Sequence, residues 1–250
     1  MLTHAIALLS VCTGATQESP SAKTLIEKML ARYYAAKTLT GQIKLTVSAG
    51  GGSATLNTNV QYERPSKFYL FQQKTSGNPD PEAPSKWLVT SDGTMFSYNT
   101  PNDKYLAGPG VRLGEPVHNP RTKTDHTIAT IYAAAAKSIG DRSMPLDIAI
   151  SGKEDLIFRI GQWQTRQTSG STQIAGQTAY IVKGMYRPHA GAQTIGEFQM
   201  SITADGDLLQ YIETQHVAVE GREVKVVSQW DVQFAVNGKV DPSLFKVIIR

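Results

Sequence analysis

The sequence has little that would cross-link the chain or carry it through a bilayer. Cys12 is the one cysteine among 250 residues, so no disulfide can form within the chain. No apolar run approaches the roughly 18–20 residues of a membrane-spanning helix, which excludes a polytopic helical membrane protein. The hydrophobic share of 40% excludes a disordered chain. These features indicate a globular chain with a sizeable core.

Clusters of one charge sign are absent as well. The formal net charge is +4, and the basic and acidic residues are scattered along the chain. A nucleic-acid interface usually gathers its basic residues into a stripe, often with aromatic residues between them. We therefore expect no nucleic-acid partner, and only a mild attraction to anionic surfaces.

Motifs of catalysis and metal binding are missing too. None of the five histidines has a zinc-type spacing, and only His118 and His126, which flank a loop, are candidates for a weak metal pair. There is no G-x-S-x-G elbow, no P-loop and no G-x-G-x-x-G after a strand. We expect no enzyme, no cofactor and no metal site, with an unrecognised hydrolase as the alternative.

The N-terminus resembles a signal peptide. A short apolar core, Ala5 to Val11, is followed by the small residues Thr13, Gly14 and Ala15. We predict that residues 1–15 are a signal peptide and that residues 16–250 form a single domain in the periplasm or cell envelope. A buried N-terminal strand is one alternative, since residues 1–4 contain no lysine or arginine.

A second alternative for the N-terminus is lipid attachment. Leu9-Ser10-Val11-Cys12 resembles a bacterial lipobox, although Val11 stands where that pattern has a small residue. Lipidation of Cys12 would anchor the exported chain to a membrane.

The apolar periodicity predicts a helix, then strands, then helices, then strands again. The first helix is expected after Ser19-Pro20 with Ser19 as N-cap, a second from about Asp125 to Ser138, and one or two short ones over 145–158. Residues 107–124 read as a loop rich in Gly and Pro. Two-residue alternation predicts strands within 43–47, 56–62, 67–73, 86–91, 95–98, 162–168, 179–186, 194–203, 208–215 and 223–236.

These strands are joined by turns too short for parallel crossovers. The sequence therefore predicts an α+β fold. Its expected form is one large curled antiparallel sheet of about ten strands, an incomplete β-barrel, with helices packed in or over its concave side.

Several of these strands carry large apolar groups on both faces, as Phe68 and Leu70 oppose Tyr69 and Phe71. Such strands are covered on both faces or line an apolar cavity. Because three helical stretches are too few to cover so many strands, we favour a hollow that holds a ligand. The candidate lining residues, without assignment to one face, are Phe68, Leu70, Trp87, Phe96, Tyr98, Trp230 and Phe234.

Four short motifs together resemble the LolA/LolB-like family of lipoprotein-localisation carriers. They are Arg64-Pro65-Ser66-Lys67-Phe68, Val89 to Thr94 with its Asp-Gly turn, Ile202 to Gly206 with a second Asp-Gly turn, and Val240 to Phe245. The chain departs from the family pattern at Leu70, where a tryptophan is usual, and at Thr94, where a lysine is usual. The segment 140–158 is longer than in the family.

The resemblance implies a non-enzymatic cell-envelope protein that shelters a lipid or a lipoprotein acyl chain in an apolar cavity under helices that act as a lid. It also implies that Arg64 latches this lid through hydrogen bonds to helix backbone. The alternative is an envelope interaction or sensor domain that binds a protein partner through the same cleft. We further expect a monomer that can contact a membrane surface peripherally.

Overall fold

The computed structural model describes residues 19–76, 86–99, 111–139, 143–150, 163–187 and 196–248. The helices within these ranges are α1 (Ala22–Ala35), α2 (Ile128–Ile139), α3 (Met144–Ile150) and the 3-10 helix η1 (Pro242–Phe245). None of them is long and apolar enough to cross a membrane. The strands are β1 (Thr38–Ala49), β2 (Gly52–Glu63), β3 (Lys67–Ser76), β4 (Lys86–Asp92), β5 (Met95–Asn99), β6 (Arg112–Pro116), β7 (His118–Asn119), β8 (Thr124–Asp125), β9 (Trp163–Ile174), β10 (Gln177–Tyr186), β11 (Gly196–Thr203), β12 (Leu208–Val219) and β13 (Arg222–Val236).

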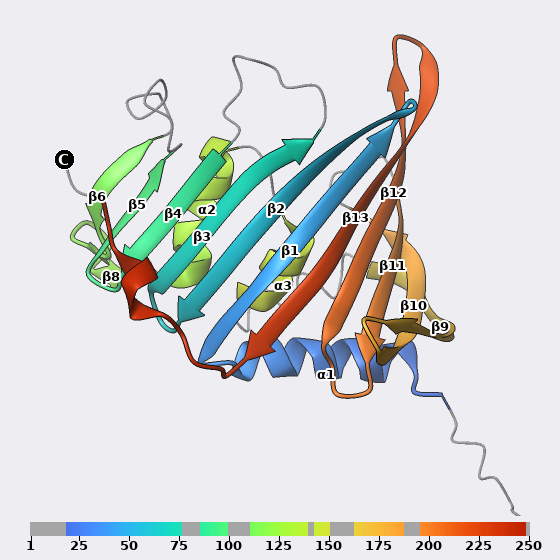
Figure 1. Cartoon of the computed structure of the whole chain (residues 1–250), viewed down its shortest axis with the longest axis horizontal. Helices are drawn as coiled ribbons and strands as arrows, with labels where there is room; N and C mark the ends of the chain where they lie inside the picture. Colours follow the sequence, from blue (N-terminus) through green and yellow to red (C-terminus); the bar gives the residue numbers. More distant parts are fainter. Residues whose placement is uncertain are drawn as a thin grey trace, which may run out of the picture.

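Eleven strands form one antiparallel sheet in the order β6-β5-β4-β3-β2-β1-β13-β12-β11-β10-β9 (Figure 1). The last long strand, β13, pairs with β1 and so joins the meander β1–β6 to the meander β9–β12. Strands β7 and β8 make a separate small hairpin. Within the described residues the edge strands β6 and β9 do not pair with each other, so the sheet is open. The predicted α+β fold with a large curled antiparallel sheet is confirmed.

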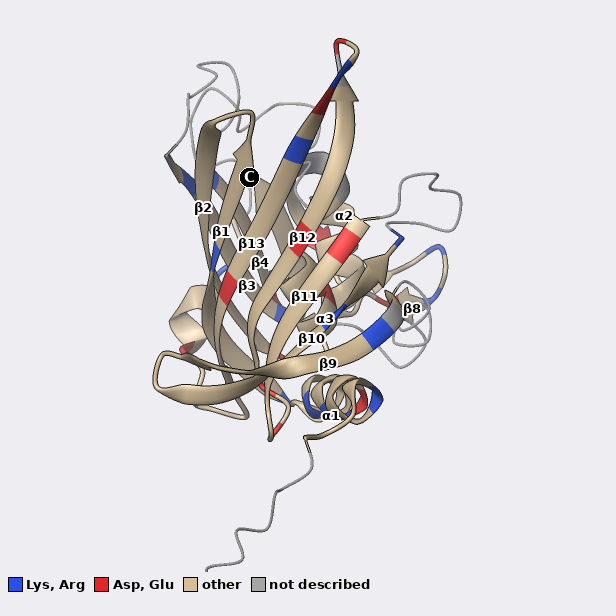
Figure 2. Ribbon diagram, turned by 90° about the vertical axis from the view of Figure 1, so that its right-hand side faces the viewer, with Lys and Arg blue, Asp and Glu red and all other residues tan. Residues whose placement is uncertain are grey.

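The sheet curls around its helices, with α2 and α3 on its concave side and α1 along one end (Figures 1 and 2). The buried side of β1 carries Leu39 and Ile43. They stand opposite Val236 and Val232 of the neighbouring strand β13. These side chains join the buried residues of the three helices in one apolar cluster. The core therefore lies between the concave face of the sheet and the helical layer.

Helix α1 is held by an apolar stripe and a capped N-terminus. Ser21, not Ser19 as the sequence predicted, is the N-cap, and its hydroxyl accepts a hydrogen bond from the Thr24 amide at 3.1 Å. The stripe is buried along the whole helix: Leu25, Ile26, Met29, Leu30 and Tyr33. This spacing places these side chains on one face of the helix, and α1 packs against α3, β9 and β11.

The turn between β11 and β12 clamps α1 from outside. Arg32 Nε lies 2.6 Å from Asp207 Oδ1, and the Tyr33 hydroxyl accepts a hydrogen bond from the Leu208 amide at 3.0 Å. Gly206 in this turn has a φ of 87°, and a Cβ there would lie 3.0 Å from the carbonyl oxygen of Lys28. Only glycine allows so close an approach at this φ.

The C-terminal segment crosses the outer face of β2–β5. The Gln61 side chain donates to the Asp241 carbonyl at 2.7 Å and accepts from the Asp241 amide at 2.9 Å. Beyond η1, the Ser97 hydroxyl donates to the Ile248 carbonyl at 2.8 Å, and Phe245 is buried. The segment from Val240 to Phe245 thus lies on the outer face of this half of the sheet, where η1 contacts β3 and β4.

Two sequence predictions about the middle of the chain need correction. The second helix begins at Ile128, three residues after the predicted start. Residues 107–124, predicted as a loop, contain the strands β6 and β7 and the first residue of β8 where they are described. The predicted helical stretch 145–158 is helical as far as Ile150, and its remainder lies outside the described residues.

Candidate functional site: the concave face of the sheet

All seven candidate lining residues lie on the same, concave face of the sheet. Residues directly opposite each other in adjacent strands point to the same side. One row of opposite residues crosses six strands: Phe234, Gly41, Val60, Leu70, Val89 and Tyr98. The rows two residues away along the strands contain Phe68 with Phe96 on one side and Trp87 with Ile43 on the other. The row that contains Trp230 and Leu45 is four residues away.

The helices pack onto this face through aromatic contacts. The rings of Phe68 on β3 and Tyr132 on α2 meet edge to face at 6.5 Å between centroids. At the other end of the face, the rings of Tyr33 on α1 and Phe234 on β13 meet in the same way at 5.8 Å. Such pairs add roughly 0.5–1.5 kcal/mol to the free energy gained by burial alone.

Polar groups interrupt this apolar face at defined places. Gln72 and Thr58 are buried opposite each other, with Gln72 Nε2 donating to Thr58 Oγ1 at 3.2 Å. The indole N–H groups of Trp87 and Trp230 are buried and find no acceptor among the described residues. Buried donors normally have a partner, so these two are open to an acceptor atom of a ligand.

The Arg64-Pro65 pair contacts all three described α-helices. Arg64 Nε donates to the carbonyl of Ala36 at the end of α1 (2.9 Å), and its Nη2 donates to the carbonyl of Ala149 in α3 (3.3 Å). The carbonyl of Pro65, which follows a cis peptide bond, accepts from the amide of Ile128 at the start of α2 (3.0 Å). An arginine fork suits this position because it can serve several carbonyl oxygens at once.

Tyr62 supports the same arrangement. Its hydroxyl donates to the carbonyl of Ala149 at 3.0 Å, and its ring lies under the Arg64 guanidinium at 5.2 Å. Burial raises the pKa of the Tyr62 hydroxyl, and the neighbouring Arg64 opposes this rise. The tyrosine therefore stays neutral and serves as a donor to α3.

A buried carboxyl, which sequence reasoning missed, lies on the concave face of β12. Glu213 stands opposite Phe198 of β11 and Ser228 of β13, and it hydrogen-bonds with the hydroxyls of Tyr186 and Tyr211. Burial raises its pKa, the two tyrosine hydrogen bonds lower it, and the charge of Asp147 on α3 raises it further. One of its oxygens has no hydrogen-bond partner within the described part of the chain.

A pocket of about 520 Å³ opens where the concave face meets the edge strand β6. Phe96 and Tyr98 form its apolar wall, with their rings stacked at 6.4 Å. Arg112 and Glu115 of β6 stand opposite Tyr98 and Phe96, respectively. A regular strand would put residues three apart on opposite faces, but the register shifts here at Gly114, whose φ is 66°, so both point to the pocket side.

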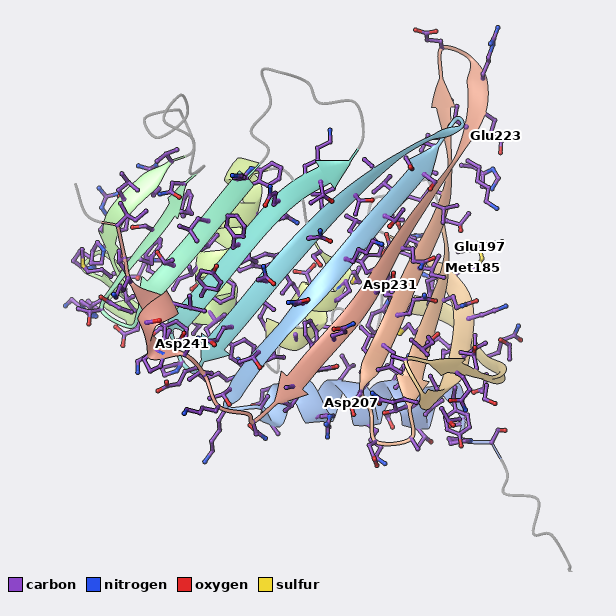
Figure 3. All side chains as sticks on the ribbon, in the orientation of Figure 1. Met185, Glu197, Asp207, Glu223, Asp231 and Asp241 are labelled. Carbon is purple, nitrogen blue, oxygen red and sulfur yellow. The ribbon has the colours of Figure 1, made fainter. Side chains whose placement is uncertain are left out.

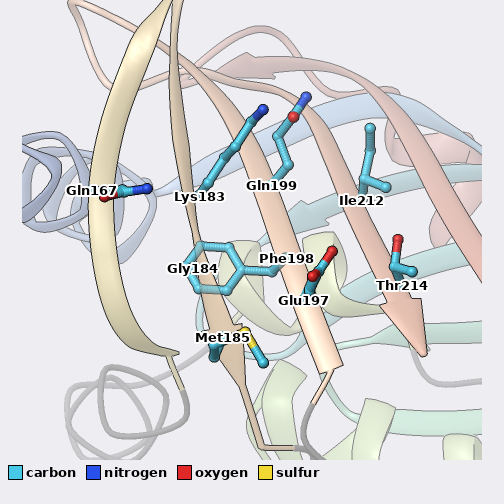
Figure 4. Close-up of a pocket in the computed structure, with 9 residues that line it drawn as sticks. All are labelled: Gln167, Lys183, Gly184, Met185, Glu197, Phe198, Gln199, Ile212 and Thr214. Carbon is cyan, nitrogen blue, oxygen red and sulfur yellow. The ribbon is translucent and has the colours of Figure 1, made fainter. Parts of the chain in front are cut away.

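The outer face of the sheet is more polar. Pockets of about 830 Å³ and about 450 Å³ lie along it, the first beside Asp231 and Asp207 (Figure 3) and the second over β9–β12 (Figure 4). The side chains of Lys183, Glu197 and Gln199 stand around the second pocket (Figure 4). Of the seven candidate lining residues, Phe234 alone is among the described residues that line these two pockets.

Of the remaining sequence candidates, His126 lines the pocket beside β6. Cys12 and the predicted signal peptide lie outside the described residues. His118 pairs with Asp125 at 2.8 Å, whereas His126 packs its ring on Phe96. Among the residues that the structure describes, no three His, Cys, Asp or Glu side chains gather as metal ligands would.

No protein-family model matches the sequence, and no curated protein matches it. Among solved structures, the chain is similar to the MucA/MucB complex of Pseudomonas aeruginosa, with a TM-score of 0.44 and 10% identity over 90% of this chain and 60% of that chain. It is also similar to LprF of Mycobacterium bovis (TM-score 0.44, 11% identity, 88% of this chain and 94% of that chain).

A LolA superfamily protein of Nitrosomonas europaea is a third similar structure, with a TM-score of 0.33 and 11% identity over 91% of this chain and 98% of that chain. The superfamily that the sequence motifs resemble is thus among the similar folds. At such low identity the likeness concerns the fold alone.

Proposed function

We propose that this chain is a non-enzymatic binding protein of the cell envelope that takes a lipid or a lipoprotein acyl chain against its concave face. The observation that carries the proposal is that the seven large apolar side chains share this one face, beneath three helices. Each methylene that moves from water to such a face contributes about 0.8 kcal/mol to the free energy of binding. An apolar surface is therefore sufficient to hold an acyl chain.

The helices α2 and α3 serve as the cover of the binding face. Their polar attachments to the sheet converge on few residues, namely Tyr62, Arg64 and Pro65. Release of these hydrogen bonds frees the cover, and an acyl chain then replaces the helices' apolar side chains on Phe68 and its neighbours. Arg64 is the latch in this scheme, since its one side chain joins α1 to α3.

Export and membrane contact complete the proposal. Residues 1–15 act as the signal peptide, with lipidation at Cys12 as the alternative that would anchor the protein. The mature domain works as a monomer and contacts the membrane peripherally while it loads or releases its ligand.

Quenching of tryptophan fluorescence by brominated acyl chains tests the proposal. Trp87 and Trp230 both lie on the concave face and are buried. We expect a phospholipid with brominated acyl chains to quench their emission, whereas the same lipid without bromine leaves it unchanged. The Trp87→Phe variant and the Trp230→Phe variant should each lose part of the quenching.

Native mass spectrometry of protein purified from cell envelopes provides the second test. A co-purified acyl ligand supports the proposal. A ligand-free mass, together with no quenching by any brominated lipid, would overturn it. Capture of a protein partner by that ligand-free form would favour the alternative of an interaction or sensor domain.

A further inference from the structure

The pocket between β5, β6 and the segment before α2 has the polarity of a headgroup site. Its inner wall is formed by Phe96 and Tyr98, which are 5% and 7% exposed. Its outer wall carries the charged or polar side chains of Arg112, Glu115, Arg121 and His126. One side of the pocket therefore favours an apolar group and the other side favours a charged one.

Both arginines of this pocket are available for a ligand. Across the described ranges, neither Arg112 nor Arg121 has an ion-pair partner, and both are exposed. The two guanidinium groups and the one carboxylate of Glu115 together carry a net charge of +1. An arginine presents paired N–H donors that match the oxygens of a phosphate group.

The apolar wall of the pocket is continuous with the concave face. Phe96 stands opposite Ser91 and in the same row as Phe68, and Tyr98 stands in the row of Leu70. Phe96 and Tyr98 also belong to the apolar cluster that includes Ile128 and Ile131 of α2. A molecule with a phosphate in the pocket could therefore extend an acyl chain under α2.

We propose that this pocket binds the phosphate group of a phospholipid whose acyl chains occupy the concave face. The inference rests on the proposed function and adds the ligand class: a phosphate-bearing amphiphile, in preference to a neutral lipid. Arg112 and Arg121 bind the phosphate oxygens, Phe96 and Tyr98 contact the first methylenes, and Glu115 disfavours ligands of higher negative charge.

Binding of three probes to the full mature chain tests this inference. They are dihexanoyl phosphatidic acid, dihexanoyl glycerol with the same acyl chains but no phosphate, and inorganic phosphate. We expect phosphatidic acid to bind at least about tenfold more tightly than the neutral lipid, which corresponds to about 1.4 kcal/mol. Added salt should reduce this advantage, because exposed charges are screened. Inorganic phosphate should bind far more weakly than either lipid.

Variants distinguish the pocket from a general attraction to anions. Arg112→Gln and Arg121→Gln should each remove most of the advantage of phosphatidic acid while leaving the neutral lipid unchanged. Arg222→Gln, at the exposed tip of the β12–β13 hairpin, is the matched control and should change neither. Glu115→Gln should change the affinity for phosphatidic acid in the opposite direction and strengthen its binding.

The outcomes separate this inference from the proposed function. Equal binding of both lipids, unchanged in the arginine variants, would overturn the phosphate site and leave acyl binding intact. Binding of neither lipid would overturn both. Equal affinity for inorganic phosphate and phosphatidic acid would show a site for the free anion and would also overturn the lipid assignment.

Discussion

Arg64 Nη2 lies 3.3 Å from the carbonyl oxygen of Ala149, so a side chain next to β2 holds the last turn of α3. The same guanidinium donates through Nε to Ala36 beyond the end of α1. The carbonyl groups at a helix C-terminus have no partner within the helix, and a cation there is favourable. One residue therefore fixes two helices relative to the sheet.

Replacement of Arg64 by leucine should loosen α3 more than α1. A hydrogen bond from a charged group is worth about 1.5–3 kcal/mol, and the Ala149 carbonyl keeps its bond from Tyr62 in this variant. Hydrogen exchange should rise in Met144–Ile150 and change little in Ala22–Ala35, since the β11–β12 turn holds α1 independently. Arg64→Lys should recover only part of the effect, because one ammonium group does not span both carbonyls.

Tyr62→Phe is the matched control for this prediction. It removes the other hydrogen bond to the Ala149 carbonyl but leaves the bond from Arg64 to Ala36. Its effect should be confined to α3 and smaller than that of Arg64→Leu. An equal rise in amide hydrogen exchange in α1 and in α3 of the Arg64→Leu variant would contradict a selective latch on α3.

Replacement of Gly206 by alanine should release the clamp on α1. Gly206 and Gly221 both have positive φ values, 87° and 76°, so alanine strains the backbone at both sites by about 1–2 kcal/mol. Only at Gly206 would the new Cβ meet the backbone of α1, 3.0 Å from the Lys28 carbonyl oxygen, whereas Gly221 has open space around it. We expect the Gly206 variant to lose about 1–3 kcal/mol more in the free energy of unfolding, measured by denaturant titration. Equal losses would mean that α1 is not held by this turn.

Part of this fold was predictable because some strands, β13 above all, alternate strictly between apolar and polar residues. In β13, Trp230 and Val232 alternate with Asp231 and Gln233, and the structure buries the first pair on the concave face. The assignment of faces in β3 was not predictable, since Phe68 and Phe71 are equally apolar in sequence. The face of each strand is set by its register with distant strands, and register is not a local property.

The charged residues of the site were hidden for different reasons. The residues next to Glu213 in the sequence do not predict that it is buried. Its burial follows from the strands β11 and β13, which pair on either side of β12. Arg112 and Glu115 are three residues apart and so predict opposite faces, whereas the bulge at Gly114 brings both to one side. A glycine within a strand can indicate a bulge, because glycine adopts positive φ. Here the surrounding sequence is typical of a loop, so Gly114 did not indicate a bulged strand.

The two aromatic faces of β3 should respond differently to truncation. Phe68 is buried under α2, and Phe68→Ala should lower the free energy of unfolding by about 3–5 kcal/mol. Phe71 points to the outer face and is half-buried, so Phe71→Ala should cost about 1–2 kcal/mol. Acyl binding should weaken in the first variant and not in the second. A larger loss of binding from Phe71→Ala would assign the ligand to the outer face.

The buried Glu213 should make the protein less stable as the pH rises. An unfolded glutamate ionises near its ordinary pKa of 4.5, whereas burial raises the pKa of Glu213 in the folded state. Between these two values the folded chain binds more protons than the unfolded chain, so the free energy of unfolding falls as the pH increases through this window. The glutamine of Glu213→Gln stays neutral and removes this loss of stability.

The stability of wild type relative to Glu213→Gln should therefore decline from about pH 4.5 upward and level off above the folded pKa. Denaturant titrations at a series of pH values measure it, and Glu197→Gln, on the exposed outer side of β11, is the matched control. A constant difference between wild type and Glu213→Gln would show that the folded protein meets the Glu213 charge with a compensating group, and the buried carboxyl would then impose no pH dependence on the concave face.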